Sequence, residues 1–330
     1  MNTSLLDRIA AETGVPDIVE ILDKHLSASD LNSLLLAVFS KKAAQITPAD
    51  LLRTYRQNRF VQPAQVDAIA FAAFCLEWLK AAQIGGFQPL QLSPVSPLGT
   101  CSVVATAHQD KILTALRGTE VVADATNVLA LESVVRRQEQ RFPAEPIHFS
   151  VVHRHVRAQE VPKVPGFSAH FSILGLTSAG RDTGSFDFEK ENLRRHIGFY
   201  KNYFEEKLGL TPVKIRLKSL GADGEENRLF QAVLSFLEKT EPSWEIKVIE
   251  SKQVEQEYYR GLQFKIVIPK PQPSGGTTQS RATTTSSEDL EIADGGFTDW
   301  TQRLSGNRKE RLLISGMGLE LLYKMLSGMV

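Results

Sequence analysis

Apolar residues recur at helical spacing throughout residues 1–84, and polar residues fill the positions between them. Gly14 ends the first helix of this region, and Pro16 begins the second. Residues 47–50, with the sequence TPAD, combine a capping hydroxyl, a proline at the first helical position and an acid in the first turn. A last helix is expected at about 64–82. The pattern predicts an all-helical N-terminal domain at 1–84, which is more typical of packing or partner binding than of catalysis.

The spacing changes at residues 85–86, where two glycines precede short β-like pieces separated by prolines. Residues 148–156 alternate apolar and polar side chains, which is the period of a half-buried strand. A loop at 160–166 and a second apolar run at 170–176 complete an antiparallel hairpin. Further helices are expected at 126–140, 188–208 and 226–239, and further strands at 213–217, 246–249 and 262–268. Residues 85–330 therefore predict a core of the α+β class.

The first strand of this hairpin carries charge on both faces. Arg154 lies between Val152 and Val156 on one face, and His153, His155 and Arg157 lie on the other. An arginine on the inner face of a hairpin is costly to bury unless it meets an anion. That anion is either a bound ligand or a carboxylate from elsewhere in the core, and the sequence leaves both open.

The charges of the chain cancel, with 38 basic and 38 acidic residues. A protein without a global field holds a polyanion poorly, which argues against nucleic acid as an obligatory partner. The two cysteines, Cys75 and Cys101, do not make a disulfide scaffold. No signal peptide opens the chain, and no apolar run approaches the roughly 20 residues that span a bilayer. We expect a cytoplasmic protein without a membrane partner.

Residues 270–288 are low in complexity, with proline, glycine, serine and threonine and almost nothing to bury. They predict a long mobile surface loop within the core domain, since loops of that length are usually functional or disordered.

The sequence offers little for metal or phosphate binding by known short motifs. It contains no GxxxxGK[ST] phosphate loop, no GxGxxG after a strand and no CxxC. The one metal-like spacing is that of His153 and His155, which share a strand face, with His148 and His170 as the nearest further candidates. Without a clear third ligand, we predict no metal site.

Separated segments that follow one another along the chain resemble class II aminoacyl-tRNA synthetases. RHVRAQ at 154–159 resembles the second class-defining motif, and HFSILG at 170–175 resembles its return strand. EYYRGLQFKI at 257–266 is similar to the paired-tyrosine segment of the histidyl branch. GGFTDWTQRL at 295–304, followed by ISGMGLELL at 314–322, resembles the glycine-rich turn and the third motif. EVVADATNVLAL at 120–131 is a weaker match to the amino-acid-binding turn. The likeness covers about 85–326 and is closest to the branch of histidyl-tRNA synthetase and the ATP phosphoribosyltransferase regulatory subunit.

The resemblance implies an antiparallel sheet flanked by helices, often dimeric, with ATP, its Mg²⁺ and an amino acid on the sheet face. Arg154 would be the catalytic residue that grips the α-phosphate. The implied nucleotide-binding residues are Arg154, Arg157, Gly316, Gly318 and Glu320. The implied amino-acid pocket is Asp124, which would receive the ammonium group, with Thr126, Gln159, Tyr258, Tyr259, Gly261, Gly295 and Gly296. The alternatives are tight packing at turns for the glycines and an ordinary core for the tyrosines.

The chain departs from the family at three charged positions. Val156 stands where the second motif has a glutamate, and Leu321 where the third motif has an arginine. Val254 stands where the histidyl branch has its catalytic arginine. Each such donor is typically worth about 3 kcal/mol of transition-state stabilisation. Unless Arg157, Arg181 or Arg311 compensates, we expect the ATP chemistry to be weakened or lost.

Three functions follow as hypotheses. The first is a paralogue that binds an amino acid, an adenylate or a similar small ligand without charging tRNA, and that regulates a partner as the ATP phosphoribosyltransferase regulatory subunit does. Only about ten residues follow the third motif, so an anticodon-reading domain and a tRNA partner are not expected. The second is an active ATP-dependent adenylate-forming ligase, on a non-tRNA or a tRNA acceptor. The third is an interaction scaffold whose residues 1–84 bind a protein partner. Whether the protein is an enzyme stays open at this point.

Overall fold

The computed structural model describes residues 3–105, 107–139, 145–159, 168–221, 224–249, 258–270 and 289–330. The predicted loop at 270–288 lies outside these ranges except for its first residue, and so does the hairpin loop at 160–166. None of the described helices is both long and apolar enough to cross a membrane.

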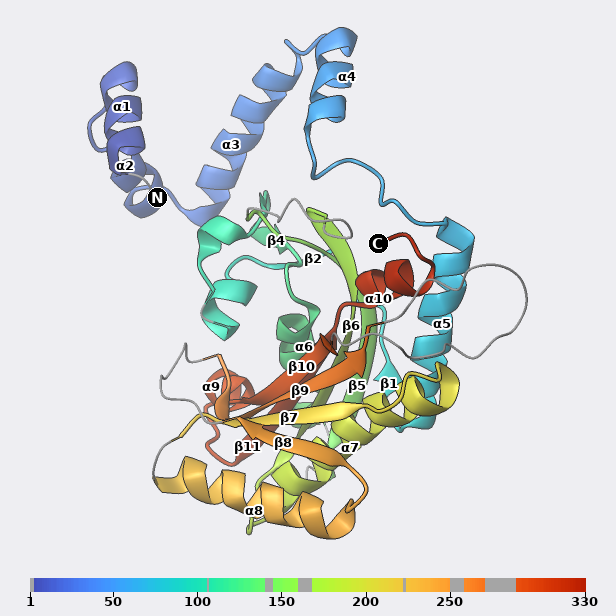
Figure 1. Ribbon diagram of the computed structural model, residues 1–330. Coiled ribbons are helices and arrows are strands. Elements are labelled where there is room, and N and C mark those ends of the chain that lie inside the picture. Colours follow the sequence, from blue (N-terminus) through green and yellow to red (C-terminus); the bar gives the residue numbers. More distant parts are fainter. Residues whose placement is uncertain are drawn as a thin grey trace.

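The N-terminal region is helical, as predicted, and its helices divide into two groups (Figure 1). The five helices are α1 (Thr3–Thr13), α2 (Ile18–Lys24), α3 (Ala28–Ala43), α4 (Pro48–Gln57) and α5 (Ala68–Ile84). The predicted start of α4 is confirmed, because Thr47 and Asp50 form a reciprocal capping box.

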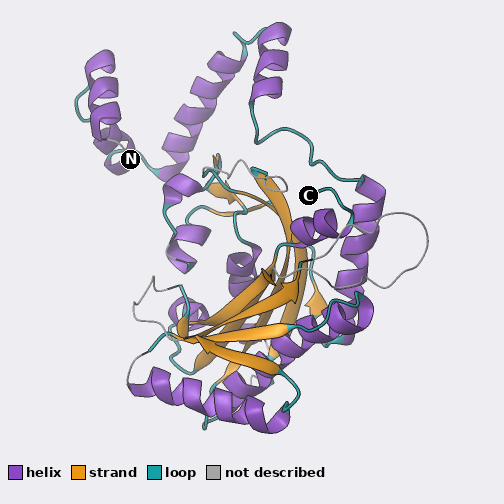
Figure 2. Ribbon diagram, viewed as in Figure 1, coloured by secondary structure: helices purple, strands orange, loops and turns teal. Residues whose placement is uncertain are grey.

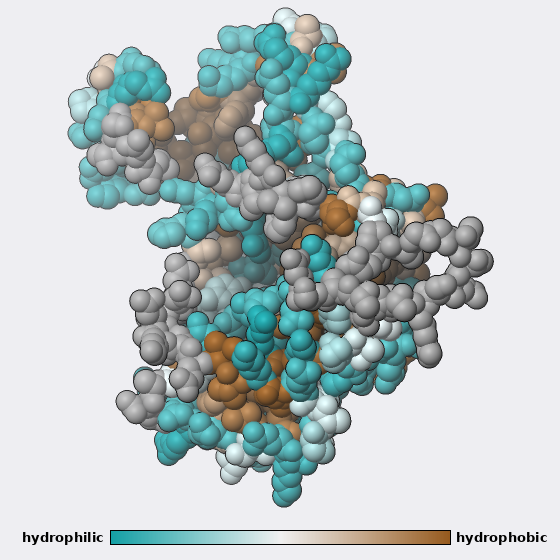
Figure 3. All heavy atoms as spheres, in the orientation of Figure 1, coloured by the Kyte–Doolittle hydropathy of each residue, from teal (hydrophilic) through white to brown (hydrophobic). Residues whose placement is uncertain are grey.

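Helices α1 to α4 lie away from the large sheet and leave large apolar side chains exposed. No residue of α2, α3 or α4 is buried. On α3, the exposed apolar residues include Leu34, Leu36, Val38 and Phe39, and they contribute to the brown surface near the top of Figure 3. Helix α5 differs, because its Phe71, Trp78 and Ala82 are buried in the core.

The core is built on one eight-stranded sheet with the order β1-β5-β6-β11-β10-β9-β7-β8. Its strands are β1 (Gln88–Pro89), β5 (Ile147–Val156), β6 (His170–Arg181), β7 (Lys214–Ser219), β8 (Glu245–Ile249), β9 (Arg260–Pro269), β10 (Asp289–Thr298) and β11 (Glu310–Met317). The hairpin β5–β6 is antiparallel, as predicted, and pairs Arg154 with Ser172. A small second sheet contains β2 (Val95–Pro97), β3 (Thr114–Ala115) and β4 (Thr119–Val121) in the order β2-β4-β3.

The predicted antiparallel sheet flanked by helices is present, and it carries one parallel pair of strands at each edge. Strands β1 and β5 pair in parallel, and so do β7 and β8. The reason for the second pair is the helix α8 (Gly224–Thr240), which connects β7 to β8, since such a crossover returns the chain in the same direction. The sheet is therefore mixed. In the order of the sheet, the six strands from β5 to β7 pair antiparallel with one another.

Helices cover both faces of this sheet (Figure 2). One face packs in a single core against α5, α7 (Asp187–Asn202), α8 and α10 (Leu319–Leu326). The other face packs against α6 (Ala125–Glu139) and α9 (Trp300–Ser305) in two smaller clusters. Because side chains alternate along each strand, consecutive residues within β5, and likewise within β6, belong to different faces of the sheet.

Trp78 shows how α5 is bound to the sheet core. The side chain is fully buried, and its ring stacks on Tyr203 with centroids 3.7 Å apart. Phe199 and Phe204 contact the same ring edge to face. We expect Trp78→Ala to lower the free energy of unfolding by about 3–5 kcal/mol, because the cavity left behind cannot collapse fully.

Chemical denaturation of the full chain measures this change. Ile69→Ala, on the same helix but with 85% of the residue exposed, is the matched control and should change the free energy by less than about 0.5 kcal/mol. Equal effects of the two substitutions would contradict the assignment of α5 to the core.

Candidate functional site

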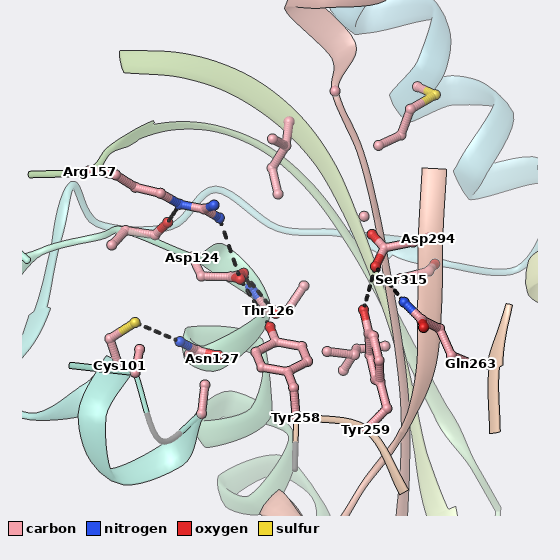
Figure 4. A pocket seen from close by; sticks show the side chains of 18 of the residues that line it. Cys101, Asp124, Thr126, Asn127, Arg157, Tyr258, Tyr259, Gln263, Asp294 and Ser315 are labelled. Carbon is pink, nitrogen blue, oxygen red and sulfur yellow. Dashed lines mark hydrogen bonds and ion pairs between the residues drawn. The ribbon is translucent and has the colours of Figure 1, made fainter. Parts of the chain in front are cut away.

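A cavity of about 1000 Å³ opens on the sheet face that α6 and α9 cover. Its walls come from the turn before α6, from the ends of β5 and β6, and from the middle of β9, β10 and β11. Figure 4 shows the polar side chains that converge on it. Eight of the predicted site residues line this cavity: Asp124, Thr126, Arg157, Gln159, Tyr258, Tyr259, Gly316 and Gly318.

Asp124 forms one polar end of the cavity. One carboxylate oxygen accepts hydrogen bonds from the backbone N–H and the hydroxyl of Thr126, at 2.9 and 2.7 Å. The other oxygen accepts from the hydroxyl of Tyr258 at 3.1 Å and lies 3.8 Å from the guanidinium of Arg157. Burial acts to raise the pKa of Asp124, but the guanidinium of Arg157 and the hydrogen bonds from Thr126 hold the pKa below its ordinary value. Asp124 is therefore a fixed anion.

Asp294, on β10, forms a second polar end that the sequence did not reveal. Its Oδ2 accepts from the hydroxyl of Tyr259 at 3.1 Å and from the side-chain amide of Gln263 at 3.5 Å. Burial raises the pKa of this carboxyl, against the hydrogen bonds of Tyr259 and Gln263. The cavity thus holds two carboxyl groups, each bonded to one of two consecutive tyrosines.

The tyrosine pair stands between these two ends. The rings of Tyr258 and Tyr259 meet edge to face with centroids 4.8 Å apart, and Tyr258 also packs edge to face on Trp300. Burial raises the pKa of both hydroxyls well above the ordinary value, so both stay protonated and serve as donors. Both tyrosines line the cavity, as a pocket role requires, and their rings also pack against neighbouring rings, as core residues do.

Arg157 is the arginine of this cavity. Its Nε donates to the backbone carbonyl of Ala123 at 3.0 Å, and its guanidinium lies 5.4 Å from the centroid of the Phe171 ring. These contacts hold the guanidinium beside Asp124 while Arg157 keeps 36% of its side chain exposed. One cation and one anion therefore lie next to each other at one end of the cavity.

Arg154, the predicted catalytic residue, lies on the opposite face of the sheet and does not line the cavity. Its guanidinium is 2.7 Å from the carboxylate of Glu320 on α10 and 2.9 Å from Nδ1 of His170. Glu320, with 1% of its side chain exposed, also pairs with Lys324 at 2.8 Å. The anion that Arg154 meets is therefore a carboxylate from elsewhere in the core, which was one of the two possibilities left open by the sequence. Alternation explains the difference, because positions 154 and 157 are an odd number of residues apart.

The predicted glycines also fall into two groups, those that line the cavity and those that are tightly packed elsewhere. A side chain at Gly316 would meet nothing closer than 3.8 Å, so this position leaves room in the cavity. At Gly296, by contrast, a Cβ would lie 2.7 Å from the ring of Tyr259, and at Gly295 it would lie 2.5 Å from the carbonyl oxygen of Ile314. Gly261 has a φ of +67° and packs against Leu229. Gly261, Gly295 and Gly296 do not line the cavity, and tight packing accounts for them.

The histidines of β5 have structural partners. His153 Nε2 lies 3.2 Å from the carbonyl oxygen of Ser93, and His155 Nε2 accepts from the backbone N–H of Ala125 at 2.9 Å. Burial lowers the pKa of His155 to about 3, so the ring is neutral. Among the described residues, no group of three histidine, cysteine, aspartate or glutamate side chains is arranged to hold a metal ion.

The residues do not fit ATP and Mg²⁺ as the resemblance implied. Arg154 faces away from the cavity, and Glu320 is taken up by two cations. Leu321 offers no charge to a γ-phosphate. Of the implied nucleotide-binding set, Arg157, Gly316 and Gly318 line the cavity, and the basic residues Lys111 and Lys218 also belong to its wall.

Sequence reasoning missed Gln263, Asp294, Asn127 and Cys101, which all line the cavity. Gln263 gave a signal, since it is a polar residue in the middle of an apolar strand. Asn127 donates to the sulfur of Cys101 at 3.3 Å, and burial raises the pKa of that thiol to about 12. Cys101 is therefore not a nucleophile at neutral pH.

No family model and no curated protein matches the chain. Solved structures do. An ATP phosphoribosyltransferase regulatory subunit/histidyl-tRNA synthetase from Bacillus halodurans C matches with a TM-score of 0.57 and 14% identity, over 82% of this chain and 83% of that chain. The apo histidyl-tRNA synthetase of S. aureus matches with a TM-score of 0.53 and 12% identity, over 79% and 69%.

A third neighbour is the RNA binding domain of threonyl-tRNA synthetase from Cryptosporidium parvum Iowa II, with a TM-score of 0.57 and 10% identity, over 77% of this chain and 63% of that chain. Identities this low speak for the fold alone. The chain has the class II aminoacyl-tRNA synthetase-like fold that its sequence predicted, with histidyl and threonyl synthetases and an ATP phosphoribosyltransferase regulatory subunit among its structural neighbours.

Proposed function

We propose that the protein is a class II synthetase-like paralogue that binds an amino acid, or a similar small ligand, and does not charge tRNA. The observation that supports this most is the pairing of Asp124 with Arg157 at one end of the cavity. A fixed carboxylate receives an ammonium group, and a guanidinium receives a carboxylate, so the two together suit the zwitterionic end of an amino acid. The open cavity also speaks against a pure scaffold.

The loss of tRNA charging is supported by the charges that are missing. Adenylate formation needs cations on the phosphates of ATP, and Arg154 and Leu321 supply none to the cavity. A regulatory role has a precedent in the name of the Bacillus halodurans neighbour. The homodimer, the cytoplasmic location and a protein partner for residues 1–84 stay proposals with it.

A thermal-shift screen with the standard amino acids, ATP and AMP tests this function. We expect at least one amino acid to stabilise the protein, by about 2.7 kcal/mol when its concentration is 100 times its dissociation constant. Asp124→Asn should weaken that ligand about 10- to 100-fold, because a hydrogen bond to a charged group is worth roughly 1.5–3 kcal/mol.

Asp187→Asn is the matched control, since Asp187 is an exposed carboxylate on α7, on the other face of the sheet. It should leave the affinity unchanged. The proposal fails if no amino acid binds, or if both substitutions weaken the ligand equally.

A second candidate function, an adenylate-forming ligase, is favoured by the position of Arg157. This guanidinium lies in the cavity and could grip an α-phosphate in place of Arg154. The ligase and the non-charging paralogue differ in one reaction, the amino-acid-dependent exchange of pyrophosphate into ATP, which reports reversible formation of an aminoacyl-adenylate and pyrophosphate.

We expect no exchange above background, and a pair of substitutions separates the two arginines. Arg157→Met should weaken amino-acid binding about tenfold and leave the stability nearly unchanged, since its side chain is one-third exposed. Arg154→Met should do the reverse, lowering the free energy of unfolding by about 1–3 kcal/mol because Glu320 loses a partner. Isothermal titration and chemical denaturation measure the two effects. Exchange that depends on Arg157 would establish the ligase instead.

A further inference from the structure

The second polar end of the cavity is a carboxyl group that no described residue meets in an ion pair. Asp294 carries its carboxyl group from β10 into the cavity, and Tyr258 and Tyr259 separate it from Asp124 (Figure 4). Within the described ranges Asp294 takes part in hydrogen bonds only, with Tyr259 and Gln263, and in no ion pair. Its cross-strand partner Lys265 is held 2.6 Å from Glu291, and Lys218, opposite Gln263 on β7, lines the same cavity but, among the described residues, makes no ion pair with Asp294.

The two tyrosine hydroxyls can only accept a hydrogen bond from a ligand on this wall of the cavity. Each hydroxyl already donates its single hydrogen to a carboxylate, Tyr258 to Asp124 and Tyr259 to Asp294. A ligand that lies against this wall must therefore bring donors.

The space beside Asp294 is open. Its cross-strand neighbour on β11 is Gly316, where a side chain would find nothing within 3.8 Å. A larger residue at 316 would occupy the place next to the carboxylate, so glycine leaves room for a ligand group there. Burial raises the pKa of Asp294, and the hydrogen bonds of Tyr259 and Gln263 and the charge of Lys265 only partly offset this effect.

We propose that the cavity binds a ligand with two separate cationic nitrogen groups, of which one is received by Asp124 and the other by Asp294. Under the proposed function, on which this inference rests, the ligand is a basic amino acid whose carboxylate meets Arg157 and whose side-chain nitrogen meets Asp294. Asp294 is then the residue that sets specificity, because an apolar side chain would leave it buried without a partner.

Matched pairs of compounds test the requirement for two cations. L-Lysine and L-ornithine are compared with L-norleucine, and the diamine cadaverine is compared with pentylamine, by isothermal titration on the full chain. We expect the compound with two cationic groups to bind about tenfold more tightly or better in each pair, since the other member leaves a buried carboxylate unpaired. Lysine and ornithine differ in side-chain length, so the one that binds more tightly indicates which length fits the distance between Asp124 and Asp294.

Asp294→Asn should remove this preference, so that lysine and norleucine bind within about twofold of each other while norleucine itself is unchanged. Asp289→Asn, on the same strand but in an exposed pair with Lys214, is the control and should keep the preference. Circular dichroism and denaturation of each variant show whether it is folded.

The outcomes separate this inference from the proposed function. If norleucine binds as tightly as lysine, or if Asp294→Asn weakens all amino acids equally, the inference is wrong and the amino-acid site stands. If cadaverine binds and no amino acid does, the two-cation site stands and the proposed function is wrong. If none of these compounds binds, both are wrong.

Discussion

The alternation of side chains along the β5–β6 hairpin decides which arginine reaches the cavity. Residues 154 and 157 are three positions apart, so their guanidinium groups leave the hairpin on opposite sides. On one side, Glu320 is almost fully buried and needs cations, and it takes Arg154 and Lys324. On the other side the cavity keeps Arg157, next to Asp124. One buried carboxylate on α10 thus removes from the ligand site the arginine that the family resemblance placed there.

The two ends of the cavity consequently suit different chemistry from that of a triphosphate. Both carboxyl groups, Asp124 and Asp294, are fixed by tyrosine hydroxyls that stay protonated. Anions placed against this wall would be repelled, whereas donors and cations would find acceptors ready. The cavity of this class II synthetase-like fold thus combines two carboxyl groups with the basic residues Arg157, Lys111 and Lys218 and with two glycines.

Local patterns predicted the elements of the fold well, because helices, caps and hairpins are set by neighbouring residues. The capping box at Thr47 and the β5–β6 hairpin are examples. The site was predictable only in part, since its decisive contacts join distant residues. Tyr258 meets Asp124 across 134 positions, and Ser172, opposite Arg154, donates its N–H to Glu320 across 148. Asp294 gave no local signal, because its partners Tyr259 and Gln263 lie 35 and 31 positions away along the chain.

The same hairpin is also a place where the N-terminal region meets the core. Arg59 donates to the carbonyl of Gln159, a residue of the cavity wall, at 2.6 Å. The carbonyl of Gln62 lies 2.6 Å from Nε2 of His170, whose other nitrogen contacts Arg154. The segment after α4 therefore touches both sides of the hairpin, one beside the cavity and one beside the buried ion pair. Any movement of this hairpin end would change both contacts at once, and helices α1 to α4 directly precede the segment along the chain.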